Sequence, residues 1–338
     1  MRLSHDDLLL TSFLADWPAR PASDPELDDV EKLLARAEHH GLAGVISDAL
    51  QRDGIEVPRS SSLRDLAREL DSRAQFAQVC AIDHVFAEAA VVAVVLKGPL
   101  FAMRFYPRPA ARVSSDVDLL VRERDLTSTS SLLIGMGYRP GAAATEERFR
   151  RDHHHLHFTH PRLVPLELHF HAYRGFGRTL PSEPLMFRSV PFRELKAIRV
   201  LSMEDELVYL ATHGAAHKFG RWSWLFDLRM MIDTMADTQL YDTAKRAREL
   251  GFARPLALAA QLLVSIMGMD PQKIAPLGQL DPIRARLAER LLESPSSRPM
   301  AALSRLLFTS ALCSDSTTTA KWVADELIRR SRQLFGDS

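Results

Sequence analysis

The sequence predicts an α+β fold, in which a small mixed β-sheet core lies between two helical regions. Two strand-like segments predict the core: an apolar run rich in β-branched residues at 91–96 and a second segment at 112–121. Helical spacing of apolar residues on either side predicts the flanks. We therefore expect an N-terminal helical region at 1–88, an α/β core at 89–200 and a C-terminal helical region at 201–338.

Composition limits the classes of partner. The chain has 338 residues, with 43 Lys plus Arg against 43 Asp plus Glu. Balanced charge argues against a long nucleic acid, which normally needs a basic excess on the protein. Cys80 and Cys313 lie far apart without a Cys-x-x-Cys pair, which is typical of thiols in a reducing compartment. No apolar run reaches the roughly 18 residues of a membrane span, and no signal-peptide pattern opens the sequence, so we expect a cytoplasmic protein.

The helical regions carry recognisable start signals. Asp24 is the expected cap of a first helix, with Pro25 in its first turn. A long helix is expected from residue 63 to about residue 90, after a loop rich in serine. In the C-terminal region, Ser202 is the expected cap of another helix.

The centre of the chain combines a glycine turn with paired carboxylates. After the first strand, Gly98 allows a sharp turn and Pro99 suits the first position of a helix. Asp116 and Asp118 stand two residues apart on the second strand, so their side chains share one face. Such a pair alone is often a solvated strand edge. Beside this turn and between apolar residues, it favours a Mg²⁺ site, because the cation relieves the repulsion of the carboxylates.

A third carboxylate follows on a later segment. Residues 148–158 and 163–170 predict two strands joined by a turn at 159–162. Glu167 lies on the second of these strands, opposite in direction to its apolar neighbours. If that strand pairs with the strand of the aspartates, Glu167 adds a third acid to the same face. The alternative is an ordinary acid on a half-exposed strand.

Histidines on these two strands raise a zinc hypothesis. One face of the first strand carries three of them and one face of the second carries two, namely His153, His155 and His157, and then His169 and His171. Imidazoles with a carboxylate suffice for Zn²⁺. The sequence has no helical His-Glu-x-x-His, so structural or phosphate-facing histidines are the favoured interpretation.

These patterns together resemble the DNA polymerase β type nucleotidyltransferase superfamily. Within it, the chain is similar to the bacterial group of uncharacterised nucleotidyltransferases over roughly residues 30 to 235. The residues that carry the resemblance are Leu96-Lys97-Gly98, Tyr106, Arg112, Asp116-Val117-Asp118-Leu119-Leu120-Val121, Leu166-Glu167-Leu168-His169 and the stretch from His213 to Asp227.

The resemblance implies a nucleotidyltransferase core and a reaction. A nucleoside monophosphate would pass from a nucleoside triphosphate, with ATP the favoured donor, to a hydroxyl acceptor, and pyrophosphate would be released. Two Mg²⁺ ions would be held by the catalytic acids Asp116, Asp118 and Glu167. The residues expected to bind the nucleotide are Lys97, Gly98, Arg112, Ser114, Ser115 and His217.

The chain departs from the superfamily at two places. Pro99 stands where Ser or Gly is common, and proline has no N–H to offer a phosphate. We expect the ammonium of Lys97 to supply a contact to the β or γ phosphate instead. The segment Tyr106-Pro107-Arg108-Pro109 resembles an inserted loop. Neither departure removes an expected metal ligand.

The acceptor is expected to be a small molecule, a peptide or a protein. His213 and His217 stand four residues apart on one face of a helix, and we expect an acceptor between this helix and the strand of Glu167. Two other readings stay open. One is a non-catalytic nucleotide-binding or antitoxin-like partner protein with the same fold, and the other is a histidine-dependent metallohydrolase.

Overall fold

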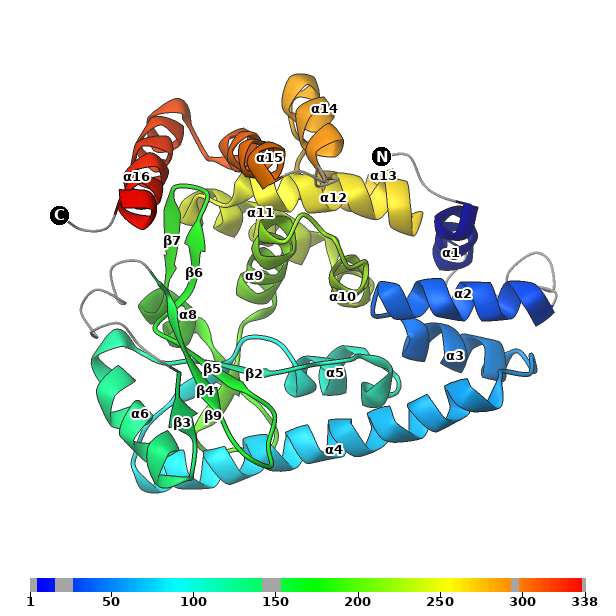
Figure 1. Ribbon diagram of the computed structural model, residues 1–338, viewed down its shortest axis with the longest axis horizontal. Coiled ribbons are helices and arrows are strands. Elements are labelled where there is room, and N and C mark those ends of the chain that lie inside the picture. The colour runs from blue at the N-terminus through cyan, green and yellow to red at the C-terminus, as the bar shows by residue number, and fades with distance from the viewer. Residues whose placement is uncertain (1–4, 16–26, 142–152, 293–297, 336–338) are drawn as a thin grey trace.

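The predicted α+β architecture is confirmed. A computed structural model describes residues 5–15, 27–141, 153–292 and 298–335. Figure 1 shows the sheet on one side of the molecule, with the long helix α4 (Arg59–Glu88) running beneath it and helices of the C-terminal region above it. The expected division into three regions remains a prediction.

The main sheet is mixed and has the strand order β3-β4-β5-β2-β1-β9-β8 within the described residues. A separate pair, β6–β7, extends from it. The strands are β1 (Ala93–Val95), β2 (Val117–Leu120), β3 (Arg139–Pro140), β4 (His155–Thr159), β5 (Leu166–His169), β6 (His171–Gly175), β7 (Arg178–Pro181), β8 (Val190–Pro191) and β9 (Ile198–Val200).

The α-helices before and between the strands are α1 (His5–Ala15), α2 (Leu27–His39), α3 (Ala43–Arg52), α4, α5 (Pro99–Phe105), α6 (Leu126–Gly135) and α8 (Ser182–Arg188). Those after the sheet are α9 (Met203–Ala216), α10 (Ser223–Ile232), α11 (Asp237–Leu250), α12 (Ala253–Met267), α13 (Pro271–Ile274), α14 (Pro282–Leu291), α15 (Arg298–Leu312) and α16 (Ser316–Phe335). Short 3₁₀ helices are η1 (Pro109–Ala111), η2 (Glu123–Asp125) and η3 (Ala275–Leu277).

Strand register decides which side chains meet. β2 pairs with β1 antiparallel and with β5 parallel, and β5 pairs with β4 antiparallel. The pairing of the aspartate strand with the Glu167 strand is therefore confirmed, with Asp118 opposite Glu167. Because side chains alternate along a strand, the neighbours Val117, Leu119 and Leu166 point to the other face.

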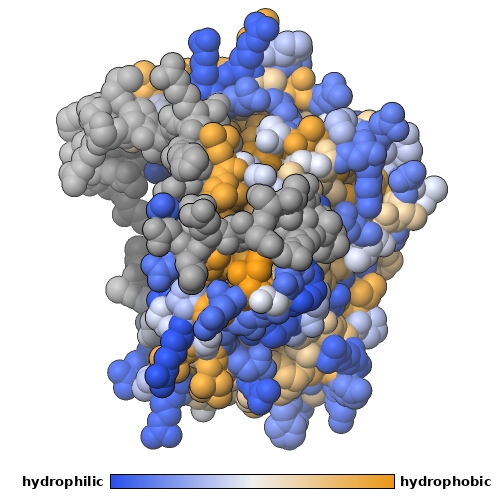
Figure 2. Space-filling model, turned by 90° about the vertical axis from the view of Figure 1, so that its right-hand side faces the viewer, coloured by the Kyte–Doolittle hydropathy of each residue, from blue (hydrophilic) through white to orange (hydrophobic). Residues whose placement is uncertain are grey.

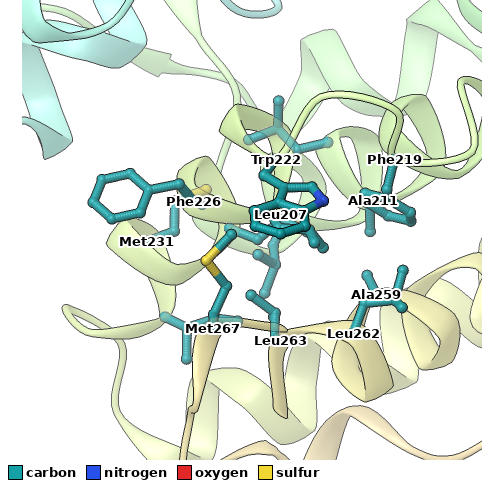
Figure 3. Packing of buried hydrophobic residues seen from close by; sticks show 14 of the residues in the cluster. Leu207, Ala211, Phe219, Trp222, Phe226, Met231, Ala259, Leu262, Leu263 and Met267 are labelled. Carbon is teal, nitrogen blue, oxygen red and sulfur yellow. The ribbon is translucent and has the colours of Figure 1, made fainter. Parts of the chain in front are cut away.

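Each sheet face is covered by different helices. Apolar residues of α4 and α6, such as Phe86 and Leu133, pack on the face that holds Val117 and Leu119. The opposite face contributes Leu120 and its neighbours to a larger cluster that joins the N-terminal and C-terminal helices. Figure 3 shows part of this cluster, where side chains from α9, α10 and α12 interdigitate. Burial on this scale is the main stabilising contribution to the fold.

Several expected local signals appear as predicted. Pro99 occupies the start of α5, and the Ser202 hydroxyl accepts a hydrogen bond from the backbone N–H of Asp205 at the start of α9. The predicted cap at Asp24 and Pro25 lies outside the described residues.

The outer surface carries mixed character. Hydrophilic residues cover much of the face drawn in Figure 2, and hydrophobic residues form smaller groups between them. None of the helices in the described part of the chain combines the length and the apolar character that a membrane span requires.

A buried carboxylate fastens α4 to the sheet. Asp83 is buried on α4 and accepts hydrogen bonds from three successive backbone N–H groups at β9, those of Lys196 at 3.1 Å, Ala197 at 2.8 Å and Ile198 at 2.7 Å. Hydrogen bonds to an ionised acceptor are stronger than neutral ones, so this carboxylate sets the distance between helix and strand.

We expect Asp83→Ala to lower the free energy of unfolding by about 2–3 kcal/mol, because buried N–H groups lose their acceptor. Urea unfolding followed by circular dichroism measures the change. Asp71→Ala, on an exposed turn of the same helix, is the matched control and should change stability by less than about 0.5 kcal/mol. Equal effects of the two substitutions would contradict the proposed anchor.

Candidate active site

The turn between β1 and α5 requires glycine. Gly98 has a φ of +91°, a backbone conformation that side chains with a Cβ rarely adopt. A Cβ built there would lie 3.3 Å from Ser114 Oγ and 3.5 Å from the carbonyl oxygen of Asp116. The turn thus brings the backbone of residue 98 against the segment that carries the aspartates. α5 spans only seven residues, so the positive end of its helix dipole at Pro99 is weak.

The three predicted acids gather at one edge of the paired strands. Asp118 is buried at 1% exposure, and the side chain of Glu167 is 26% exposed beside it on β5. Asp116 lies just before β2 with 25% of its side chain exposed. Burial and the nearby charge of Asp118 raise the pKa of Asp116. The acids therefore form a graded cluster, from a buried centre to an accessible rim.

Lys97 neutralises part of this charge. Its Nζ lies 2.5 Å from Asp118 Oδ2 and 3.2 Å from Asp116 Oδ1. Burial alone would lower the pKa of Lys97, but the attraction of Asp118 and Asp116 outweighs it and raises that pKa. The sequence analysis predicts a phosphate contact for this ammonium. In the structure it bridges the two aspartates, and the phosphate contact remains a prediction.

His169 joins the remaining two acids. Its Nε2 lies 3.1 Å from Asp118 Oδ1 and 3.4 Å from Glu167 Oε2, and the residue is 3% exposed. Burial disfavours the charged ring, yet the hydrogen bonds to both carboxylates raise the pKa of His169. The hydrogen bond between His169 and Glu167 is also the main reason that the pKa of Glu167 is lowered. Against the cost of burial, the charge of Lys97 and the His169 hydrogen bond hold the pKa of Asp118 well below its usual range.

Sequence analysis named His169 in the zinc hypothesis and in the motif Leu166-Glu167-Leu168-His169, but gave it no role in the nucleotidyltransferase site. The signal was present in the Glu-x-His spacing, because residues two apart on a strand share a face. The spacing alone could not separate His169 from His171, which follows two residues later. In the structure His171 lies on β6 and is not part of the cluster.

Helix α9 closes the other side of the cluster. Tyr209, His213 and His217 follow at four-residue intervals, and their rings approach one another along one helix face. Burial and the charge of Lys97 lower the pKa of both histidines. The His217 ring also lies 5.1 Å from the Trp224 ring at 38°. Sequence analysis did not name Tyr209 as a site residue, although it stands four residues before His213 and so shares the helix face of the two histidines.

Arg112 does not stand free for a phosphate. Its Nε and Nη2 each donate to Asp227 at 2.8 Å, and the Tyr106 hydroxyl donates to the same carboxylate at 2.7 Å. The Asp227 side chain is 1% exposed and that of Arg112 is 7% exposed. Sequence analysis predicted nucleotide binding for Arg112 from the family resemblance. It did not predict the pairing with Asp227, which lies 115 residues away. The structure gives this arginine a partner within the fold.

The two serines before the acids differ in their surroundings. Ser114 Oγ donates to the carbonyl of Asp116 at 2.9 Å, and its own carbonyl accepts from the Gln75 side chain on α4 at 2.7 Å. Ser115 is exposed. Ser114 therefore shapes the loop, and Ser115 has the more accessible hydroxyl.

The donor chemistry suits a divalent cation. Three carboxylates gather around one ammonium and one imidazole, and Asp118, Glu167 and His169 each offer a ligand atom within 4.8 Å of the other two. Clustered carboxylate oxygens are what Mg²⁺ prefers. The excess of negative over ammonium charge favours a cation beside Lys97.

Comparison with protein families agrees with this geometry. A family described as "uncharacterised nucleotidyltransferase" matches residues 26–268. The chain belongs to this family. The match covers the glycine turn, the three acids, α9 and the Asp227 helix. The family's name indicates nucleotidyltransferase activity in general. No curated protein and no solved structure matches the chain.

We expect Arg112→Met to lower the free energy of unfolding by about 3–5 kcal/mol, because it leaves Asp227 buried without its cation. Chemical denaturation measures this value. Arg124→Met, at a side chain with 69% exposure, is the control and should cost under about 0.5 kcal/mol. A stable Arg112→Met protein that merely binds nucleotide more weakly would restore the phosphate role predicted from sequence.

A second prediction concerns Lys97. The pKa of Asp118 is lower in the folded protein than in the unfolded chain, where it is about 4. The ionised carboxylate therefore stabilises the fold above about pH 4, and this stabilisation is lost as the pH falls through the pKa of the folded protein. Lys97→Met removes the main cause of that depression. We expect the variant to be less stable at pH 7 by about 3–5 kcal/mol.

The difference in the free energy of unfolding between the variant and the wild type should shrink below about pH 4, since protonation of Asp118 removes less stability from the variant. Urea unfolding at pH 7, 5 and 3.5 measures it, with the exposed Lys196→Met as control. A difference that stays constant across this range would show that Lys97 acts through packing alone.

Proposed function

We propose that this protein transfers a nucleoside monophosphate from a nucleoside triphosphate, with ATP the favoured donor, to a hydroxyl acceptor and releases pyrophosphate. The observation that carries the proposal is the convergence of Asp116, Asp118 and Glu167 beside the glycine turn at Gly98. Membership of the nucleotidyltransferase family supports the reaction class.

The three acids are the residues that would hold Mg²⁺. When bound, two such ions would orient the triphosphate and stabilise the charge that develops on the attacked phosphate and its leaving group. The graded burial of the acids supports this role, because Asp118 is enclosed while Asp116 and Glu167 reach the accessible rim.

The protein's own groups supply positioning and proton transfer. Glu167 would accept the proton of the acceptor hydroxyl, since its side chain is 26% exposed beside the buried Asp118. His169 holds that carboxylate through its Nε2 and so fixes the direction of its oxygens. Lys97 lies one residue from the turn and is our candidate for the contact to the distal phosphates.

The acceptor would bind between β5 and α9. His217 is exposed at the end of α9, and its ring lies 5.1 Å from the Trp224 ring. Burial is the main cause of its lowered pKa, and the charge of Lys97 lowers that pKa further. An aromatic and imidazole surface suits a small molecule or a peptide or protein side chain. The balanced charge of the chain makes a long nucleic acid a poor candidate.

The test is incubation of the purified protein with each of the four labelled triphosphates and Mg²⁺, followed by measurement of pyrophosphate and of labelled protein or metabolite. We expect Asp118→Asn to reduce release to the background rate, because it removes a charge at the centre of the cluster. Glu167→Gln should slow transfer by about 10²- to 10⁴-fold, the usual contribution of a general base.

The matched control is Glu194→Gln, an exposed acid outside the site, which should retain wild-type turnover. Wild-type rates in Asp118→Asn would contradict the assigned site. Nucleotide binding without pyrophosphate release from any of the four triphosphates would instead favour the non-catalytic partner protein.

A further inference from the structure

A group of imidazoles lies next to the acids and shares His169 with them. Ring nitrogens of His154, His155 and His169 lie within 4.8 Å of one another. The strand pairing explains this, because His155 is directly opposite His169 in the β4–β5 ladder. The backbone carbonyl of His154 accepts from the N–H groups of Phe170 and His171 at 3.0 and 3.3 Å, which fixes residue 154 against the end of β5.

Two of these rings have an unused nitrogen. Nδ1 of His169 is buried and finds no hydrogen-bond partner among the described residues, and the same holds for Nδ1 of His155. Their other nitrogens face Glu167, at 3.4 Å from His169 Nε2 and 3.8 Å from His155 Nε2. A buried nitrogen without a partner is costly, so a native protein normally satisfies it.

This is the environment of a metal-binding histidine. Such residues commonly bind the metal with one ring nitrogen and donate the other N–H to a carboxylate, which fixes the tautomer and strengthens the ligand. Glu167 and Asp118 stand in the position of that carboxylate for His169.

We propose that His154, His155 and His169 bind one Zn²⁺ ion, with Glu167 and Asp118 as carboxylate partners of the rings. Nitrogen ligands select zinc and its neighbours among the transition metals, whereas the oxygen-rich cluster beside them selects Mg²⁺. Three imidazoles leave the fourth zinc position for water or a ligand. The ligand set differs from the zinc hypothesis of the sequence, since it includes His154 and leaves out His153, His157 and His171.

The experiment titrates metal-free full-length protein, prepared by dialysis against a chelator, with Zn²⁺ in competition with a chromophoric chelator. We expect one Zn²⁺ per chain. His154→Asn and His155→Asn should each weaken binding by at least about tenfold, since even carboxylate partners of metal ligands are worth about 10- to 100-fold. With Co²⁺ in place of Zn²⁺, the visible absorption bands of nitrogen ligation should appear and be lost in the same variants.

Two controls separate this site from its surroundings. His157→Asn changes an exposed histidine on the same strand and should bind Zn²⁺ like the wild type. Asp116→Asn should abolish nucleotidyl transfer yet leave zinc affinity unchanged, so the two proposals can fail independently. Circular dichroism shows whether each variant folds, and His154→Gln replaces His154→Asn if that one does not.

Less than one Zn²⁺ per chain, equal affinities in all histidine variants, or a loss in Asp116→Asn as large as in His155→Asn would each overturn the proposal. The last outcome would assign the bound metal to the acids.

Discussion

The buried ion pair between Arg112 and Asp227 joins the catalytic loop to the helical half of the molecule. Asp227 lies on α10, while Arg112 and Tyr106 belong to the connection between β1 and β2. A bidentate guanidinium–carboxylate pair fixes direction as well as distance. Since this connection leads directly into Asp116 and β2, its attachment to α10 determines where the acids stand relative to α9. Loss of one partner alone would leave a buried charge, which is strongly destabilising.

The acids themselves are held together by a balance of charges. Three carboxylates on one sheet face repel one another, and the structure offsets this with Lys97 on one side and His169 on the other. His169 belongs to both proposed sites, because its Nε2 faces the acids and its Nδ1 faces no described hydrogen-bond partner. A cation bound near either nitrogen would therefore act on the other through one ring. Occupancy of the histidine site and the orientation of Glu167 are thus physically connected.

Much of the site follows from strand periodicity. Asp116 and Asp118 were expected on one face and Glu167 on a paired strand, and the register of β2 with β5 confirms that pairing. The pairing of Arg112 with Asp227 was not foreseen, because the two residues are 115 positions apart in the sequence. Lys97 was expected near the phosphates, but nothing local to the sequence specifies that its side chain reaches back across the turn to the aspartates. The three-region division, the nucleotide and the acceptor remain predictions.

The sequence by itself determined the local features, because these depend on neighbours within a few residues: the glycine at a positive φ, the helix starts at Pro99 and Ser202, and the face shared by the aspartates. Its family membership followed from the same short patterns. Only the tertiary structure decided which charges meet. It set His169 between two acids and brought His154 rather than His157 into the imidazole group. Those outcomes depend on strand order, register and helix packing, which arise from contacts between segments far apart in the chain.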